Sequence, residues 1–471
     1  MHDLVLINDF FRPHVPYSYG KISLHAYLFK KGWDVALIQP NKITTLGPNP
    51  ARFFGVGSWS LDFWSVVKTA SFLKKRYPHI PIICGGGHVT ACPSDLQKHA
   101  DIFDYWVLGE GEVSLDEILQ GKHQRHTFIR RPIQATDLTL PLSAHNKVIH
   151  SLHLSMASRG CINKCSFCGT HSMFGNTIRH IPVPQYIEHI KSLLTQGMTT
   201  LSFMDSSFFN DPRWATDFCN AVINEQLQFN WMAFVCAEQL TEDRITLMKK
   251  AGCIVLKIGV ESGSALLLTT MNKKHQLPET IRSLNLCKQY GIHIHIFLMY
   301  GLLDEDRESM VATREFYNLI KPDSFDLSRY QPFPGTAMFD LAKRRGILSA
   351  YDWSTGDFPQ LTHTGGMTID ELHQEYSRLW GGAQYHRSII PNLKRFALIF
   401  VPVVLIQAVL LKLLHLKILI CILSLEAWPA SFRKKLQNKR FFLIGRIHIY
   451  QATMLQHLSY HNRSLSPEEM S

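Results

Sequence analysis

Strand-like apolar runs alternate with helix-like stretches along most of this chain, and this alternation restricts the fold more than any other feature. Over residues 1–125 the apolar runs predict strands at 4–8, 34–39, 53–57, 80–86 and 103–109. The stretches between them predict helices at 20–31, 62–76 and 112–120. Apolar strands separated by helices of this length form a parallel sheet with both faces covered. The first 125 residues therefore predict a doubly wound, Rossmann-like α/β domain, whose ligands bind at the carboxyl ends of the strands.

A second series of strands and helices occupies residues 151–345. Its strands are expected at 152–157, 199–205, 229–235, 253–260, 292–301 and 323–330. Its helices are expected at 183–196, 211–226, 241–251, 278–290 and 306–319. Such a run of βα units predicts a partial (β/α)6 TIM-type barrel, with its chemistry at the carboxyl ends of the strands. Residues 126–150 are polar and weakly periodic and predict a linker, and residues 346–390 predict a polar extension.

Three of the ten cysteines lie close together, at positions 161, 165 and 168, directly after the first strand of the second series. Thiolates at these gaps on a tight loop can hold an iron–sulfur cluster. Three ligands leave one iron open to chelate the amino and carboxylate groups of a substrate. The alternative is a zinc site, which needs four ligands and has only His171 nearby as a fourth. The other cysteines are scattered, most of them in apolar patterns that predict buried core side chains.

The segment Ser158-Arg-Gly-Cys161-Ile-Asn-Lys-Cys165-Ser-Phe-Cys168 resembles the CxxxCxxC signature of the radical SAM superfamily. Further segments resemble that family in order and spacing: Met204–Phe208, Ala251–Ser264, Met271–Lys273, Tyr300–Leu303 and Tyr330–Thr336. The resemblance implies a [4Fe–4S] cluster, held by the three cysteines, that reductively cleaves S-adenosylmethionine (SAM). The residues that it assigns to SAM are Phe167, Asp205, Glu261 and Ser262.

Two of these assignments have a physical basis and also an alternative. Glu261 ends an apolar strand, where its carboxylate can accept hydrogen bonds from two ribose hydroxyls; the alternative is a loop carboxylate in solvent. Asp205 ends another strand, and the alternative is a cap for the helix that follows. The third barrel strand ends in Cys236-Ala-Glu238, where relatives often carry Arg. The partner of the SAM carboxylate is therefore unassigned, with Arg329 and Lys257 as candidates.

Glycine-rich loops follow three of the N-terminal strands, at 57–60, 84–90 and 108–112. Glycine at a strand end lets the backbone approach a ligand closely. Together the loops resemble the cobalamin-binding domain that precedes many radical SAM barrels. The residues that this resemblance assigns to cobalamin are Ser58, Gly85, Gly86, Gly87, His88 and Thr90. The DxHxxG motif that supplies a cobalt-ligating histidine elsewhere is missing around His14, so a degenerate domain without cobalamin is the alternative.

The net charge of +11 is concentrated in the C-terminal tail, residues 391–471. Residues 391–450 contain ten Lys or Arg and one acid, so the rest of the chain is near neutral and nucleic acid is not predicted as a partner. Within the tail, 396–411 is apolar but short for a membrane span. We expect a helical tail that lies on an anionic membrane surface, with a tilted or re-entrant segment and a buried contact as alternatives.

The acidic N-terminus, MHDLVLIND, lacks the pattern of a secretory signal, which favours a cytoplasmic protein. With the tail, we expect it at the inner face of the membrane. The predicted chemistry requires a one-electron reductant of the flavodoxin or ferredoxin type. It moves a methyl group from cobalamin to an unactivated carbon of a small, lipid-like molecule. The alternatives are a radical cyclisation, rearrangement or oxidation without methyl transfer, and a cobalamin or iron–sulfur sensor without turnover.

Overall fold

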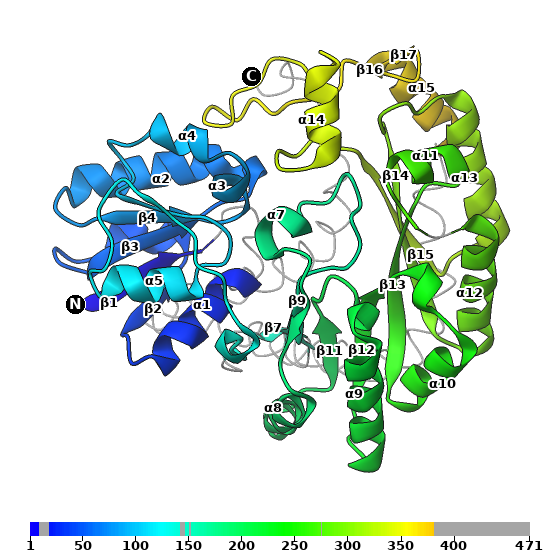
Figure 1. Ribbon diagram of the computed structural model, residues 1–471, viewed down its shortest axis with the longest axis horizontal. Coiled ribbons are helices and arrows are strands. Elements are labelled where there is room, and N and C mark those ends of the chain that lie inside the picture. Colours follow the sequence, from blue (N-terminus) through cyan, green and yellow to red (C-terminus); the bar gives the residue numbers. More distant parts are fainter. Residues whose placement is uncertain (9–17, 142–146, 150–151, 275, 381–471) are drawn as a thin grey trace, which may run out of the picture. The chain divides into compact units, whose positions relative to one another are not determined.

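The computed structural model describes residues 1–8, 18–141, 147–149, 152–274 and 276–380 (Figure 1). Its first sheet has six strands, all parallel, in the order β2-β1-β3-β4-β5-β6. The strands are β1 (His2–Ile7), β2 (Val35–Ile38), β3 (Ala51–Gly57), β4 (Ile82–Gly85), β5 (Tyr105–Val107) and β6 (Phe128–Ile129). The helices are α1 (Tyr19–Lys30), α2 (Phe63–Arg76), α3 (Gly87–Ala91), α4 (Pro93–Gln97) and α5 (Glu112–Leu119).

Both faces of this sheet are buried, as the apolar strands predict. Successive side chains of a strand point to opposite faces. Val5 and Ile7 of β1 therefore pack in one core with α2, whereas Leu4 and Leu6 pack in another with α1 and α5. Figure 1 shows α2 on one face of the sheet and α1 with α5 on the other. The predicted doubly wound domain is confirmed.

The second sheet has seven strands in the order β15-β14-β13-β12-β11-β8-β7. Its parallel strands are β8 (Leu152–Ser155), β11 (Thr200–Phe203), β12 (Asn230–Val235), β13 (Cys253–Glu261), β14 (His293–Tyr300) and β15 (Ser324–Arg329). The helices that alternate with them are α8 (Val183–Thr195), α9 (Pro212–Asn224), α10 (Glu242–Lys250), α12 (Leu277–Gln289) and α13 (Arg307–Ile320). Because β15 and β7 end the sheet without pairing to each other, the barrel is partial, as predicted.

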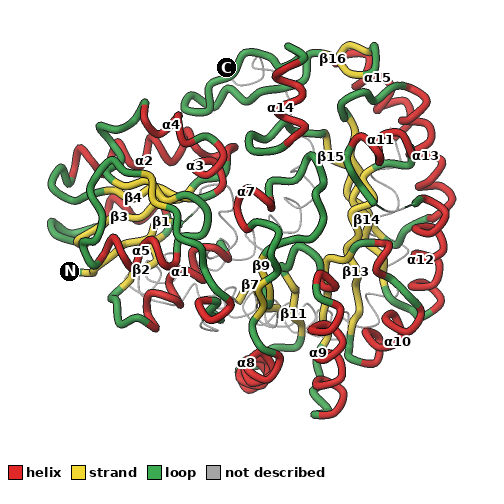
Figure 2. The backbone as a smooth tube through the Cα atoms, in the orientation of Figure 1, coloured by secondary structure: helices red, strands yellow, loops and turns green. Residues whose placement is uncertain are grey.

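The inner and outer faces of this sheet differ in burial. In β13, Leu256, Ile258 and Val260 are fully buried, whereas Lys257 and Gly259 between them are half-buried. Helices α10, α12 and α13 lie along the outer side of the strands (Figure 2). The half-buried positions therefore face the inside of the barrel.

The predicted linker contains two strands that the sequence analysis missed. β6 extends the first sheet, where Phe128 and Trp106 of β5 have ring centroids 4.7 Å apart. β7 (Lys147–Ile149) pairs antiparallel with β8 at the edge of the barrel sheet. The segment 126–150 thus adds an edge strand to each sheet.

The shorter elements complete the unit Met1–Gly381. They are β9 (Ser158–Arg159), α7 (Thr170–Phe174), β10 (Arg179–His180), α11 (Ala265–Thr270), α14 (Ala337–Arg344), β16 (His363–Thr364), β17 (Met367–Thr368) and α15 (Ile369–Trp380). In the predicted polar extension, 346–390, Trp353 joins the core that α2 covers, as does Phe339 of α14. The tail, 391–471, lies outside the described residues. None of the helices in the described part of the chain has the length and hydropathy to span a bilayer.

Candidate active site

The three cysteines of the motif lie on the loop between β9 and α7, and we call residues 161–168 the cysteine loop. All three thiols are half-buried. The loop is fixed from two directions: Ser166 N donates to Met271 O at 2.9 Å, and Met338 N donates to Ser166 O at 2.9 Å. Backbone bonds to elements on either side hold the thiols in place before any ligand arrives.

Gly160 determines how the chain enters this loop. Its φ is +101°, and a Cβ at this position would collide with the carbonyl oxygen of Thr177. Only glycine accommodates both the backbone conformation and the neighbouring bend that contains Thr177. The Gly that precedes Cys161 is therefore a requirement of the loop geometry.

The donor set fits an iron–sulfur cluster. Burial raises the pKa of the Cys161 thiol, and it raises that of Cys165 to about 11, so metal binding there must displace protons. Within the described ranges, no group of three or more His, Cys, Asp or Glu side chains is arranged to hold a single metal ion. This absence argues against a single ion such as zinc, whose ligands must all meet at one atom. It does not argue against a cubane cluster, in which each thiolate binds a different iron.

Asp205, predicted to contact SAM, follows β11 and is fully buried beneath the start of the cysteine loop. Its carboxylate accepts hydrogen bonds from Ala157 N at 3.1 Å, Ser158 N at 2.6 Å and Ser158 Oγ at 2.5 Å. Burial raises its pKa to about 6, against the lowering effect of these bonds. The observed role of Asp205 is to hold the backbone that leads from β8 to Cys161, and a SAM contact stays a prediction.

The raised pKa of Asp205 predicts a pH dependence of stability that Asp205→Asn removes. The folded protein binds the proton more tightly than the unfolded chain, whose ordinary value is 3.8. Stability is therefore greatest below that value and is lost as the pH rises through about 6. We expect the free energy of unfolding of the wild type, relative to Asp205→Asn, to fall by about 2 kcal/mol between about pH 4 and pH 7. Urea unfolding of both proteins across this range measures it, and a constant difference contradicts it.

Glu261 ends β13 in a conformation that is unusual for a side chain with a Cβ. Its φ is +72°, the register with β14 shifts between Gly259 and Glu261, and the side chain is buried. A Cβ on Gly259 would collide with the Glu261 carboxylate. Lys273 Nζ lies 3.7 Å from Glu261 Oε1 and donates to Gly259 O at 2.7 Å. Strained residues of this kind cluster at functional sites.

Lys273 is the charged residue that sequence reasoning did not assign, although the Met271–Lys273 segment was the signal. It is half-buried, with a side chain 11% exposed, and besides Glu261 its charge acts on Cys165 and Cys236. Cys236, the residue after β12, accepts a hydrogen bond from Asn163 Nδ2 at 3.1 Å. The lysine thus supplies positive charge beside the cysteine loop.

Ser262 and Phe167 are already engaged by the protein. Ser262 Oγ lies 3.0 Å from Thr313 Oγ1 of α13 and accepts a hydrogen bond from Ser264 N at 3.1 Å. Phe167 packs against the apolar cluster that contains Met271. Their predicted SAM contacts are not tested by these interactions.

The two candidates for the SAM carboxylate lie on opposite faces of the barrel sheet. Lys257 Nζ donates to Ser202 Oγ at 3.3 Å and lies 5.1 Å from the Phe234 ring centroid, inside the barrel. Arg329 shares a strand face with the buried Leu327, and its Nη1 lies 3.4 Å from His373 Nε2 of α15. The guanidinium therefore points to the helical layer. Lys257 is four residues before Glu261, or about 13 Å along the strand.

The N-terminal loops converge at the carboxyl ends of β3 and β4. Gly86 has a φ of +103°, and a Cβ there would stand 2.6 Å from Ser58 O. A Cβ on Gly87 would stand 2.8 Å from the ring of Trp59, whose side chain is 60% exposed. Ser58 is buried, yet its Oγ has no hydrogen-bond partner among the described residues. An unpartnered buried hydroxyl beside glycine backbone fits a ligand at this edge.

The other residues assigned to cobalamin serve the protein itself. His88 is completely buried, with its ring centroid 4.2 Å from Phe63 and 5.5 Å from Trp353. Thr90 Oγ1 accepts from Gly109 N at 2.7 Å and so ties α3, which follows β4, to the loop after β5. Gly85 lies in β4 beside Val107. His88 therefore packs in the core, and its cobalamin contact stays a prediction.

Comparisons with known proteins also divide the chain into an N-terminal part and a barrel part. The B12 binding domain family matches residues 12–119, and the radical SAM superfamily matches residues 156–317. An uncharacterized methyltransferase, PH0819, of Pyrococcus horikoshii is 25% identical over 347 residues, which cover 68% of this chain and 74% of that protein. The bacteriochlorophyllide d C-12(1)-methyltransferase of Chlorobaculum tepidum is 24% identical over 289 residues, which cover 59% and 62%.

A solved structure has a similar fold. It is that of TsrM from Kitasatospora setae, a radical S-adenosylmethionine methyltransferase with cobalamin and a [4Fe–4S] cluster bound. The alignment has a TM-score of 0.66 and 15% identity and covers 83% of this chain and 93% of that one.

Proposed function

We propose that this chain, which belongs to the radical SAM superfamily and carries an N-terminal B12-binding domain, is a cobalamin-dependent enzyme that methylates an unactivated carbon of a small molecule. One observation carries the proposal furthest. Three half-buried thiols stand on a loop held from both sides, next to the strained Glu261 and its partner Lys273. Such a site suits a cluster with one iron free for SAM.

The residues of this chain then have separate tasks. Cys161, Cys165 and Cys168 hold the cluster, and Glu261 accepts hydrogen bonds from the SAM ribose. Lys273 balances negative charge beside the cysteine loop, a role supported by its 3.7 Å contact with Glu261 and its effect on Cys165. When bound, the cluster and one SAM would supply a 5′-deoxyadenosyl radical, and cobalamin would supply a methyl group that it receives from a second SAM.

Anaerobic incubation with SAM and a one-electron reductant tests this proposal. We expect 5′-deoxyadenosine to form and the purified protein to carry iron, sulfide and a corrinoid. With SAM labelled at its methyl group and a pool of small molecules, we expect the label in a new carbon-bound methyl group. Without 5′-deoxyadenosine the enzyme proposal fails, and a sensor is favoured. 5′-Deoxyadenosine without labelled product would favour a radical reaction without methyl transfer.

Ser58 provides a test of the cobalamin edge. Because its Oγ has no partner among the described residues, Ser58→Ala removes no protein hydrogen bond that the structure records. We expect it to weaken corrinoid binding by roughly tenfold, the value of one hydrogen bond, with stability unchanged. Equilibrium binding of hydroxocobalamin measures the effect.

The control for this substitution is Ser60→Ala, which removes the 3.1 Å contact between Ser60 Oγ and His88 Nδ1. It is expected to lower stability and to leave corrinoid affinity unchanged. Equal corrinoid affinity of Ser58→Ala and the wild type would argue against a ligand at this edge.

The C-terminal tail is the basis for a proposed location of the protein at a membrane surface. The apolar, basic segment 396–425 lies outside the described residues, and its sequence alone supports attachment to the inner, anionic membrane surface. Sedimentation with anionic vesicles at low salt and release at high salt is the expected behaviour. Such a location favours a lipid-like substrate. The electrons are expected to come from a small reductant protein.

A further inference from the structure

A buried ion network joins the two α/β parts immediately before the cysteine loop. Arg159 of β9 is two residues before Cys161 and is 8% exposed. Its Nη1 lies 2.9 Å from Glu110 Oε1, and its Nη2 lies 2.6 Å from Glu112 Oε1. Both glutamates are buried; Glu110 lies in the glycine-flanked loop that follows β5, and Glu112 begins α5.

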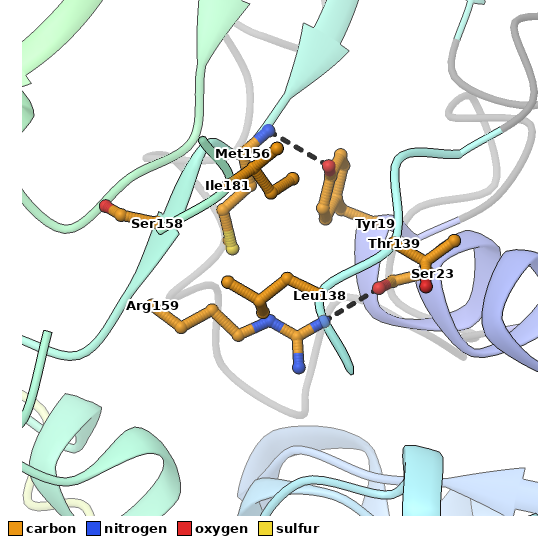
Figure 3. A pocket seen from close by; sticks show the side chains of 8 residues that line it. All are labelled: Tyr19, Ser23, Leu138, Thr139, Met156, Ser158, Arg159 and Ile181. Carbon is orange, nitrogen blue, oxygen red and sulfur yellow. Dashed lines mark hydrogen bonds between the residues drawn. The ribbon is translucent and has the colours of Figure 1, made fainter. Parts of the chain in front are cut away.

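A second arginine completes the network. Arg179 of β10 is the register partner of Arg159, and its Nη1 lies 2.5 Å from Glu110 Oε2. Arg159 Nη2 also donates to Ser23 Oγ of α1 at 2.7 Å (Figure 3). Two guanidinium groups from the barrel side thus meet two carboxylates from the N-terminal side, and the formal charges cancel.

Another hydrogen bond lies beside this network. Met156 N, just after β8, donates to the hydroxyl of Tyr19 of α1 at 2.9 Å (Figure 3). Both contacts link α1 of the first sheet to the segment between β8 and the cysteine loop. The N-terminal domain therefore binds this segment through two hydrogen bonds, at Met156 and at Arg159.

The chemistry of the network suits a role in orienting the two parts of the chain better than a role in stabilising the fold. Burying an ion pair gains little net stability, because desolvation opposes the attraction. Paired hydrogen bonds from a planar guanidinium, however, fix direction and distance. The glutamates lie at the same carboxyl edge of the first sheet as Ser58 and Gly86. A rigid link from this edge to Arg159 sets how far that edge stands from the thiols.

We propose that Arg159, Arg179, Glu110 and Glu112 are positioning residues that fix the spacing between the corrinoid and the cluster. This inference rests on the proposed function, since it concerns both cofactors. By fixing this spacing, the network places the methyl donor and the radical source at distances from which both can react with the same substrate carbon. Without it, SAM cleavage continues while the two cofactors lose their fixed separation.

Two substitutions on one helix provide a matched test. Glu112→Gln removes the carboxylate that pairs with Arg159. Glu117→Gln makes the same change on α5, where Glu117 pairs instead with Arg131 and His123 of its own domain. The readout is the electron-spin relaxation of reduced cobalamin, which a nearby reduced cluster accelerates, in anaerobic protein loaded with both cofactors. A purely structural role for Glu112 would not change this readout at equal cofactor content.

We expect Glu112→Gln to keep iron and corrinoid within twofold of the wild type and to keep forming 5′-deoxyadenosine. Its relaxation enhancement is expected to fall at least threefold, whereas Glu117→Gln matches the wild type. If Glu112→Gln loads poorly, Arg159→Met/Glu112→Met takes its place, since apolar replacement of a buried pair preserves folding.

Each outcome decides the proposal. Unchanged relaxation in the loaded variant overturns the inference and leaves the proposed function standing. Loss of the cluster from both Glu112→Gln and the double variant also overturns it, because the network would then serve only to fold the loop. A wild type that binds no corrinoid overturns the proposed function and, with it, this inference.

Discussion

Replacing any one of Cys161, Cys165 and Cys168 with alanine is expected to abolish 5′-deoxyadenosine formation and remove the iron–sulfur absorbance. Changes around the ligands of a metal site already cost 10–100-fold in affinity or activity, so loss of a direct ligand is expected to exceed ~100-fold. The fold is expected to persist, because the loop is held by backbone bonds to Met271 and Met338 that do not involve the thiols. Iron content, absorbance and product formation under anaerobic conditions measure these effects.

The matched control is Cys92→Ala, which removes a half-buried thiol outside the cysteine loop. We expect full iron content and undiminished SAM cleavage in that variant. Cleavage that survives in any one of the three loop variants would mean that the loop does not hold the cluster. One zinc per chain in place of iron, lost in the loop variants, would favour the zinc site.

Gly160→Ala is expected to destabilise the protein more than any other glycine substitution in the cysteine-loop region. A side chain at this positive φ costs about 1–3 kcal/mol in backbone strain. The collision with Thr177 O adds the cost of overpacking, about 1–3 kcal/mol. We expect a lower free energy of unfolding and poor cluster loading, because Gly160 leads directly into Cys161.

Gly175→Ala isolates the first contribution, the backbone strain. Gly175 ends the same region with a φ of +72°, yet a Cβ there meets nothing within 4 Å. It is therefore expected to pay only the backbone strain. Urea unfolding of the two variants gives the difference, and equal losses would contradict the collision at Gly160.

Most of the secondary structure follows from local patterns. The strand predicted at 292–301 is observed as β14, His293–Tyr300, and the helix predicted at 183–196 as α8, Val183–Thr195. Apolar periodicity is a property of the local sequence, so it can be recognised without knowing which distant segments pack against it. β6 and β7 were missed because strands of two or three residues form through pairing with an existing sheet.

The candidate site divides in the same way. The sequence placed the three thiols on one loop, because their spacing of a few residues fixes their proximity. It did not place His88, which became a core side chain when Trp353 and Phe63 packed against it. Nor did it reveal that Asp205 holds the backbone at residues 157–158.

The sequence by itself therefore determined the two α/β domains, the order of their elements and the residues that can ligate a cluster. The tertiary structure alone decided which charged groups meet across long stretches of chain. Arg159 pairs with Glu110 and Glu112, and Lys273 pairs with Glu261, only after the sheets bring their loops together. The physical reason is that strand and helix patterns depend on neighbours in sequence, whereas a side chain's direction and partners depend on which distant surfaces bury it.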